Sequence, residues 1–246
     1  MSDEFGKCDR LNNCGYFRAP NAPPRELATP EPVPQIPQQF IHPDLVKGTF
    51  MWHDRNPFIV GLKEIFPSEK VDEVVKKLYI GTTKNLETVF WLIHPTRKIW
   101  NAKIIKYNGI KRDKEKNAWY FKKKEDGFLQ TFFGFHLFDM KKDTKIVESE
   151  KTVVFGMLIH PEFNWLGAGS NFGITNEKAR QIKELGYVGS LDLLPDCDKA
   201  GREGFTKGLD NLDSYSLRAK IQDIGDSRDD GADFADIVLE RMGVKK

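Results

Sequence analysis

Lys145-Ile-Val-Glu148-Ser-Glu150-Lys151-Thr152 opens the stretch that decides the fold, which runs from Lys145 to Phe205. Near the end of this stretch stands a second acidic segment, Leu193-Leu-Pro-Asp196-Cys-Asp198-Lys199-Ala-Gly201-Arg202. Each segment predicts a short apolar strand that runs into acidic residues and then into a helix. In parallel sheets such residues meet at the carboxyl ends of the strands, where ligand sites form. Carboxylates brought within ~4 Å repel by about 4 kcal/mol per pair at an effective dielectric of ~20. We therefore expect a compensating Mg²⁺ or Mn²⁺ ion, since these cations prefer oxygen ligands.

The whole region from residue 141 onwards alternates between strand and helix patterns. This alternation predicts a parallel sheet with right-handed crossovers, which is an α/β fold. Thr175 has the position and side chain of a helix N-cap, and Gly186 suits the end of the same helix. The expected strands are 146–147, 164–169, 187–194 and 217–223, and the expected helices are 152–159, 175–185, 199–209 and 234–242.

These motifs resemble the Toprim domain shared by primases, topoisomerases and related nucleases, which carries a Glu after one strand and an Asp-x-Asp after a later one. Glu148 matches the first position, and Asp196 and Asp198 match the pair. The primase-like branch, of the type found in Bacteroidetes mobile elements, often adds further features. Its matches here are the glycine-rich turn Gly167-Ala-Gly169-Ser-Asn, the helix start Asp196–Gly201 and the acidic segment Asp230–Asp236.

The resemblance implies a DNA primase-like nucleotidyltransferase that acts on single-stranded DNA in the replication of a mobile element or phage. Asp196 and Asp198 would hold the divalent metal, Glu148 would be a further ligand or the acid/base group, and Asp233 is the expected extra carboxylate. Nucleotides and a replicative helicase are the other expected partners. Two alternatives stay open: a non-catalytic DNA-binding module that recruits a helicase or relaxase, and a metal-dependent Toprim nuclease.

Composition sets wide bounds on the protein. The net charge is +2 and 39% of residues are hydrophobic, so a packed core is expected and bulk charge gives no argument for nucleic acid. No apolar run reaches the ~18 residues that a membrane span needs. The start Met-Ser-Asp-Glu lacks the pattern of a signal peptide, and three cysteines do not suggest a disulfide framework. We expect a cytoplasmic protein that does not bind membranes.

The N-terminal region has a different character from the rest. Cys8 and Cys14 resemble half of a zinc ribbon, and they would bind Zn²⁺ only if other ligands completed the module; two free cysteines are the alternative. A proline-rich stretch follows, which predicts an extended linker. The expected domains are a partial zinc-ribbon-like segment at 1–20, the linker at 21–43, a primase-like α+β subdomain at 44–140 and the Toprim-like domain at 141–246.

The predicted α+β subdomain combines helices with a β-hairpin. Apolar spacing predicts a helix at 58–66, and Ser68 is the expected N-cap of the next helix. Strands at 88–93 and 98–107 form the hairpin. Its basic positions resemble those that primases present to nucleic acid, although strict alternation puts Lys103 on the face opposite Lys98 and Lys106. The expected nucleic-acid contacts are Lys98, Lys103, Lys106, Lys151 and Arg202.

Overall fold

The computed structural model describes residues 6–7, 17–18, 36–116, 118–225 and 228–244, and it divides the chain into a unit at 1–35 and a unit at 36–246. In the first unit, β1 (Gly6–Lys7) pairs antiparallel with β2 (Phe17–Arg18). The predicted zinc ligands Cys8 and Cys14 and residues 19–35 of the proline-rich stretch lie outside the described residues.

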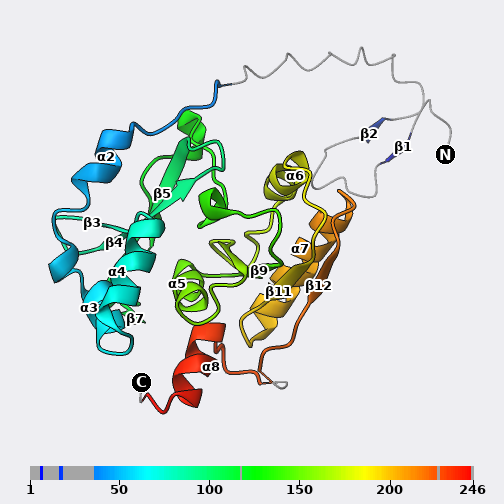
Figure 1. Ribbon diagram of the computed structural model, residues 1–246. Helices are drawn as coiled ribbons and strands as arrows, with labels where there is room; N and C mark the ends of the chain where they lie inside the picture. The colour runs from blue at the N-terminus through cyan, green and yellow to red at the C-terminus, as the bar shows by residue number, and fades with distance from the viewer. Residues whose placement is uncertain (1–5, 8–16, 19–35, 117, 226–227, 245–246) are drawn as a thin grey trace. The chain divides into compact units, whose positions relative to one another are not determined.

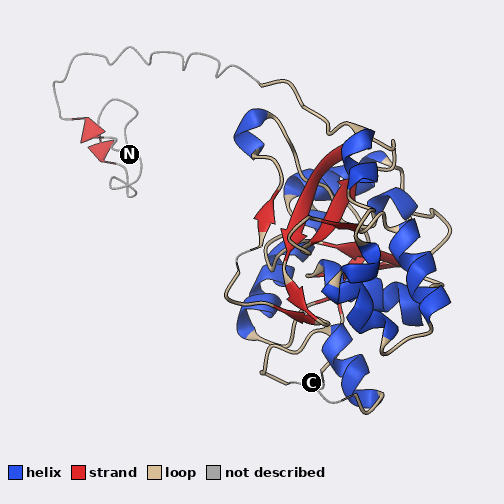
Figure 2. Ribbon diagram, turned by 90° about the vertical axis from the view of Figure 1, so that its left-hand side faces the viewer, coloured by secondary structure: helices blue, strands red, loops and turns tan. Residues whose placement is uncertain are grey.

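An antiparallel sheet with the order β3-β4-β5-β8 forms one part of the second unit (Figures 1 and 2). Its strands are β3 (Gly81–Thr82), β4 (Thr88–Ile93), β5 (Ile99–Ile105) and β8 (Trp119–Tyr120). A small hairpin of β6 (Tyr107–Asn108) and β7 (Lys111–Arg112) extends from the end of β5. Both main strands of the predicted hairpin are therefore present, and β4 has the predicted bounds.

Three helices precede this sheet: α2 (Pro43–Gly48), α3 (Pro57–Lys63) and α4 (Ser68–Lys77). The Asn56 side chain caps α3 by accepting hydrogen bonds from the backbone N–H groups of Phe58 and Ile59. The predicted cap at Ser68 is wrong. Pro67 occupies the N-cap position of α4 and its carbonyl accepts the N–H of Val71, so Ser68 is already the first helical residue.

A parallel sheet with the order β10-β9-β11-β12 forms the other part, and it confirms the predicted α/β fold. Its strands are β9 (Thr144–Val147), β10 (Asn164–Gly167), β11 (Leu191–Leu194) and β12 (Ala219–Ile221). The helices are α5 (Glu150–Ile159), α6 (Asn176–Glu184), α7 (Lys199–Asp213) and α8 (Phe234–Arg241). Short 3₁₀ turns complete the unit at His53–Arg55, Lys124–Asp126 and Phe135–Leu137.

Side chains alternate between the two faces of the parallel sheet, and each face has its own apolar core. Ile146, Leu191 and Leu193 belong to the cluster that also contains residues of α6 and α7. Val147 and Leu194 belong to the cluster that contains residues of α5 and α8. The sheet is thus flanked by helices on both faces, as the sequence predicts.

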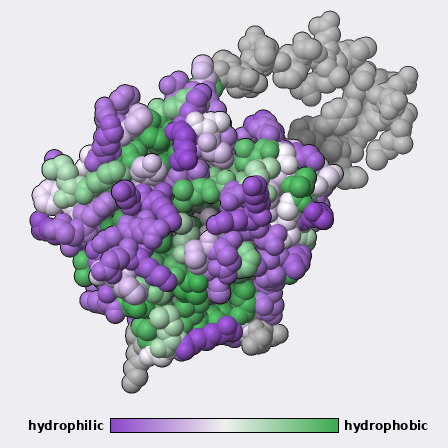
Figure 3. Space-filling view, in the orientation of Figure 1, coloured by the Kyte–Doolittle hydropathy of each residue, from purple (hydrophilic) through white to green (hydrophobic). Residues whose placement is uncertain are grey.

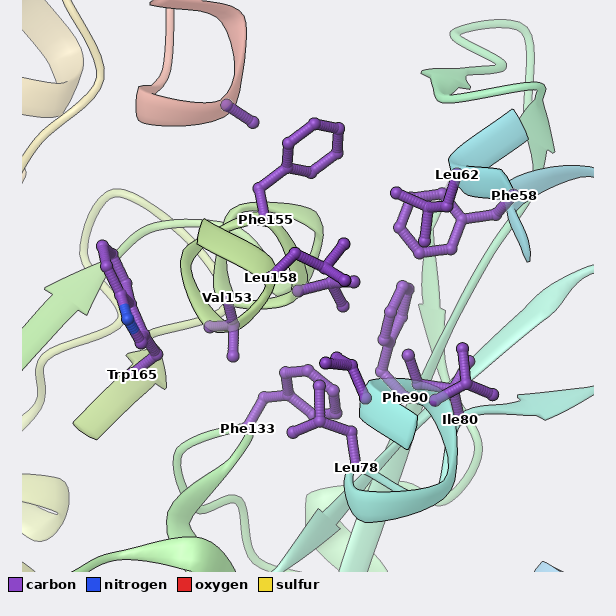
Figure 4. Close-up of a cluster of buried hydrophobic side chains, with 14 of the residues drawn as sticks. Phe58, Leu62, Leu78, Ile80, Phe90, Phe133, Val153, Phe155, Leu158 and Trp165 are labelled. Atoms are coloured by element: carbon purple, nitrogen blue, oxygen red, sulfur yellow. The ribbon is translucent and has the colours of Figure 1, made fainter. Parts of the chain in front are cut away.

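The core around α5 joins the two sheets of the second unit (Figure 4). Phe155 and Leu158 of α5 lie in one cluster with Phe58, Leu62 and Phe90 from the antiparallel part. Burying each such side chain stabilises the fold by about 1.5–3 kcal/mol relative to leaving it exposed. The residues on either side of position 140 therefore share one core, which fixes the antiparallel sheet against the edge of the parallel one.

Helix caps start each helix of the parallel part at a defined residue. Ser149 caps α5, Thr175 caps α6 as predicted, Asp198 caps α7 and Asp233 caps α8. Among the described residues, no helix has both the length and the apolar character that crossing a membrane requires. The face seen in Figure 3 intersperses hydrophilic side chains with smaller apolar patches.

Candidate active site

The predicted acidic residues follow two neighbouring strands of the parallel sheet. Glu148 comes directly after β9, and Asp196 and Asp198 come shortly after β11. Because β9 and β11 pair in parallel, both strands deliver these residues to the same edge. The structure brings the carboxyl groups of Glu148 and Asp196 within hydrogen-bonding reach of each other.

Burial and mutual repulsion shift the ionisation of this pair. Burial raises the pKa of Glu148 to about 7, with a further rise from the charge of Asp198 and a partial offset from Lys103. Burial and the charge of Glu148 raise the pKa of Asp196 to about 8. Burial is the largest cause of both shifts, and the charges of Lys103 beside Glu148 and Lys151 beside Asp196 offset it only in part.

Asp198 serves the fold and the site together. One of its carboxylate oxygens accepts the backbone N–H of Gly201 at 2.6 Å, which caps α7. A Cβ atom at Gly201 would lie 2.6 Å from the carbonyl oxygen of Asp196, so glycine is needed where the helix begins against the acidic loop. The Asp198 charge nevertheless acts on both Glu148 and Asp196, whose pKa values it raises.

Asp233 lies near these residues but has partners of its own. It caps α8, forms an ion pair with Lys151 at 2.9 Å and accepts a hydrogen bond from the Thr152 hydroxyl at 2.9 Å. Burial works against a charged Lys151, but Asp233 and Asp236 together outweigh it and raise the lysine pKa. The Asp233 charge also raises the pKa of Asp196, so this residue contributes to the field of the site.

The expected basic residues separate into two groups. Lys103 and Lys151 line the groove that contains the acidic residues, each with carboxylate partners. Lys98, Lys106 and Arg202 do not line it. The Lys98 ammonium lies over the Phe40 ring at 4.4 Å, and Arg202 pairs with Asp229 at 2.5 Å.

Three residues to which the sequence motifs assign no role support the glycine-rich turn beside Glu148. Glu150 is buried and pairs with Lys103 at 3.0 Å. Lys178, also buried, donates to the Ala168 carbonyl at 2.6 Å, and burial lowers its pKa to about 7. The side-chain amide of Asn171 contacts the Glu148 carboxylate. Only the positions of Glu150 and Asn171 beside recognised motifs could have drawn attention to them.

A groove of about 1400 Å³ runs past this site. Its lining includes Glu148 and Asp196 together with residues of the β6–β7 hairpin. Lys111, Arg112 and Lys114 of that hairpin are exposed, and no described acidic side chain lies within ion-pair distance of them. The groove therefore offers carboxylates and unpaired cations to one ligand, although Asp113 and Glu115 also lie on the hairpin side.

The donor chemistry of the site fits Mg²⁺ or Mn²⁺. Within the described ranges no group of three or more His, Cys, Asp or Glu side chains is arranged so that it could hold a metal ion. Glu148 and Asp196 are neighbouring oxygen donors whose pKa values are raised by burial and by nearby carboxylates, and a divalent cation would favour their ionised forms. Asp198 adds a third carboxylate beside this pair, and it is already engaged as the cap of α7.

A family model described as "Domain of unknown function (DUF6371)" matches residues 56–189, which include Glu148 but end before Asp196. Curated proteins give no match. Solved structures that resemble the chain include catalytic parts of DNA primases.

The DnaG primase catalytic domain bound to ssDNA matches with a TM-score of 0.56 and 11% identity, covering 82% of this chain and 74% of that one. The E. coli primase catalytic core matches with a TM-score of 0.55 and 12% identity, covering 80% and 74%. The Aquifex aeolicus primase (zinc binding and RNA polymerase domains) matches with a TM-score of 0.47 and 17% identity. This match covers 73% of the present chain but only 47% of the Aquifex chain. At these identities the first two matches show a shared fold.

Proposed function

Since the chain belongs to the DUF6371 family, whose description leaves the activity open, we propose from its site that it is a primase-like nucleotidyltransferase of the Toprim type acting on single-stranded DNA. One observation carries the proposal. Glu148 and Asp196 meet, with Asp198 beside them, at the carboxyl edge of a parallel sheet whose fold is that of primase catalytic cores.

In the proposed reaction the 3′-oxygen of a growing chain bonds to the α-phosphorus of a nucleoside triphosphate, and pyrophosphate leaves. A divalent metal, when bound by these carboxylates, would neutralise charge on the phosphoryl oxygens. Glu148 is either one of its ligands or the group whose carboxylate accepts the proton of the attacking hydroxyl. Asp198, held rigidly as the cap of α7, gives the site a carboxylate whose position is set by the helix.

The groove supports a single-stranded substrate. Lys111, Arg112 and Lys114 line the same groove as the carboxylates and can pair with backbone phosphates. Outside the groove lining, the exposed Trp119 of β8 offers a ring on which a base of a longer strand can stack. Lys103 and Lys151 are held by Glu150 and Asp233, so their role is to set the local charge rather than to reach out for phosphates. A helicase partner and a role in a mobile element or phage belong to the same proposal.

The test is primer synthesis on single-stranded DNA with labelled nucleotides and Mn²⁺. The protein should extend product, and Asp198→Asn and Glu148→Gln should abolish synthesis while DNA binding persists. Asp210→Asn, an exposed carboxylate on the same helix α7, is the matched control and should keep full activity.

Other products would point to the alternatives. Shortened DNA would identify a nuclease, and salt-sensitive DNA binding with no metal-dependent product would identify a non-catalytic binding module. Equal synthesis by the Asp198→Asn variant would overturn the proposed site.

A further inference from the structure

We infer that Asn171 is a positioning residue for Glu148: its side-chain amide holds both carboxylate oxygens and ties them to the first turn of α7. The amide nitrogen donates to Glu148 Oε1 at 2.6 Å and Oε2 at 2.8 Å, and the amide oxygen accepts the Gly201 N–H at 3.2 Å. This orientation of the amide is the one that its neighbours require, since a carboxylate only accepts hydrogen bonds. The inference rests on the proposed metal-dependent function.

The turn that carries Asn171 is anchored directly to the strand end before it. Backbone N–H groups of Ala168 and Gly169 donate to the carbonyls of Val147 and Glu148 at 2.8 and 2.7 Å. Gly169 adopts a positive φ of 89°, a conformation that favours glycine. The chain therefore reverses right beside Glu148, which places Asn171 within reach of its side chain.

Two buried lysine side chains hold the backbone carbonyls of this turn. Lys178 donates to the Ala168 carbonyl and Lys103 to the Gly169 carbonyl, each at 2.6 Å. Lys178 comes from α6 and Lys103 from β5 of the antiparallel sheet, so the turn is fixed from two sides. This fixation makes the position of Asn171 a property of the packed core rather than of a free loop.

The helix α7 has a gap shaped for Asn171. A Cβ atom on Gly204 would lie 2.3 Å from the backbone oxygen of Asn171, so only glycine admits this close approach. The Gly201 N–H that meets the Asn171 amide also donates to Asp198. Asn171 therefore stands between the Glu148 carboxylate and the N–H group that orients Asp198.

The chemistry of an amide suits this position. A lysine or arginine there would orient Glu148 but would also neutralise it and compete with a bound cation, whereas a neutral N–H donor fixes the carboxylate and leaves its charge available. Groups that orient metal ligands in this way commonly change metal affinity by 10–100-fold when they are removed. We expect an effect of that size here.

Mn²⁺ titration of the 246-residue protein, followed by electron paramagnetic resonance of the free ion, tests the inference without relying on activity. Asn171→Ala and the similarly sized Asn171→Leu should each weaken Mn²⁺ binding about 10-fold or more. In a Glu148→Gln background, Asn171→Ala should cause no further loss, because its effect acts through Glu148. Thermal melts verify that every variant is folded. Asn171→Leu keeps approximately the side-chain volume of asparagine, so it controls for a cavity that Asn171→Ala could leave.

Asn211→Ala is the matched control. The Asn211 amide anchors the Ile174 carbonyl at 2.7 Å, near the end of the same loop, without touching the carboxylates. It should leave Mn²⁺ affinity unchanged. When Glu148→Gln alone weakens Mn²⁺ binding, any of three results would overturn the inference. The Asn171 variants could bind Mn²⁺ as tightly as the wild type, Asn171→Ala could weaken binding as much in the Glu148→Gln background as in the wild type, or Asn211→Ala could weaken binding as much as Asn171→Ala does. If Glu148→Gln has no effect either, the proposed function falls together with the inference.

Discussion

Glu148 and Asp196 place their carboxyl groups within hydrogen-bonding reach of each other although they follow different strands of the sheet. Such a contact destabilises the protein when both groups are charged and no cation is present. The candidate site is thus a place where the metal-free fold gives up stability, a common property of functional sites. This has consequences for pH dependence, metal binding and mutation.

The metal-free protein should become less stable as the pH rises from about 5 to about 8.5. In the unfolded chain carboxyl groups release their protons near pH 4. In the folded chain Glu148 and Asp196 retain them up to about 7 and about 8. Between these pH values the folded state binds more protons, so deprotonation lowers the free energy of unfolding.

The Asp196→Asn substitution removes one charge of the pair and should flatten this pH dependence. At pH 8.5 we expect a higher Tm than that of the wild type, by about 2–4 °C for each kcal/mol recovered. Differential scanning calorimetry in the presence of a chelator measures the effect. Asp210→Asn serves as the exposed control, and a Tm of Asp196→Asn that declines with pH as steeply as the wild-type Tm would contradict the prediction.

Mn²⁺ should reverse the balance. A cation that binds only the folded protein stabilises it by about 2.7 kcal/mol at a concentration 100-fold above its Kd. At pH 8.5 we expect added Mn²⁺ to raise the Tm of the wild type and to change the Tm of Asp196→Asn little or not at all. Asp196→Asn should therefore be more stable than the wild type only in the absence of metal. An equal Mn²⁺-induced rise in both proteins would place the cation elsewhere.

The sequence predicts the meeting of Glu148 and Asp196 because it depends on regular features. Apolar strands that alternate with helices give a parallel sheet, and parallel strands deliver the residues that follow them to one edge. The same local reasoning succeeds for the cap at Thr175. It fails at Ser68 because the chain enters that helix at Pro67, which leaves the Ser68 backbone already helical.

Side-chain contacts between elements that are far apart in the chain could not be predicted from the sequence. The alternation of β5 separates Lys103 from Lys98 and Lys106, but nothing in that pattern shows that its ammonium reaches Glu150 and Gly169 on the other sheet. Likewise, an acidic segment near the C-terminus draws attention to Asp233, yet its pairing with Lys151 depends on how α8 packs against α5. Such partners follow from tertiary packing and have no local signature.

The Lys103–Glu150 pair should matter strongly for stability. Lys103→Met leaves the buried Glu150 carboxylate without its ion-pair partner, and breaking a buried pair in this way costs about 3–5 kcal/mol. The double variant Lys103→Met, Glu150→Leu should be less destabilised than Lys103→Met, since it also removes the buried carboxylate that the single variant leaves without its ion-pair partner. Urea denaturation gives the free energies of unfolding, with Lys98→Met as the control from an unburied position before β5. A double variant less stable than Lys103→Met would show that the pair does not carry this energy.

The close approach of α7 to Asn171 makes Gly204 sensitive to a single methyl group. Gly204→Ala forces a backbone shift, because its Cβ would meet the Asn171 carbonyl, and we expect a loss of about 1–3 kcal/mol from overpacking. Gly48→Ala is the matched control, since a Cβ there meets nothing within 4 Å. Chemical denaturation compares the two variants. Equal stability of both would mean that the loop yields to α7 freely.

The β6–β7 hairpin should supply most of the salt dependence of DNA binding if single-stranded DNA lies in the groove. Each phosphate contact to a single strand contributes about 0.7 to the slope of log affinity against log salt, so removing three contacts should lower that slope by roughly 2. The tested set is Lys111→Glu, Arg112→Glu and Lys114→Glu, and a control set with the same change in net charge is Lys70→Glu, Lys76→Glu and Lys207→Glu, exposed positions that do not line the groove. Fluorescence anisotropy with a labelled oligonucleotide over a range of salt concentrations measures both. An equal change in slope for the two sets would reduce the effect to overall charge and remove the hairpin from the DNA path.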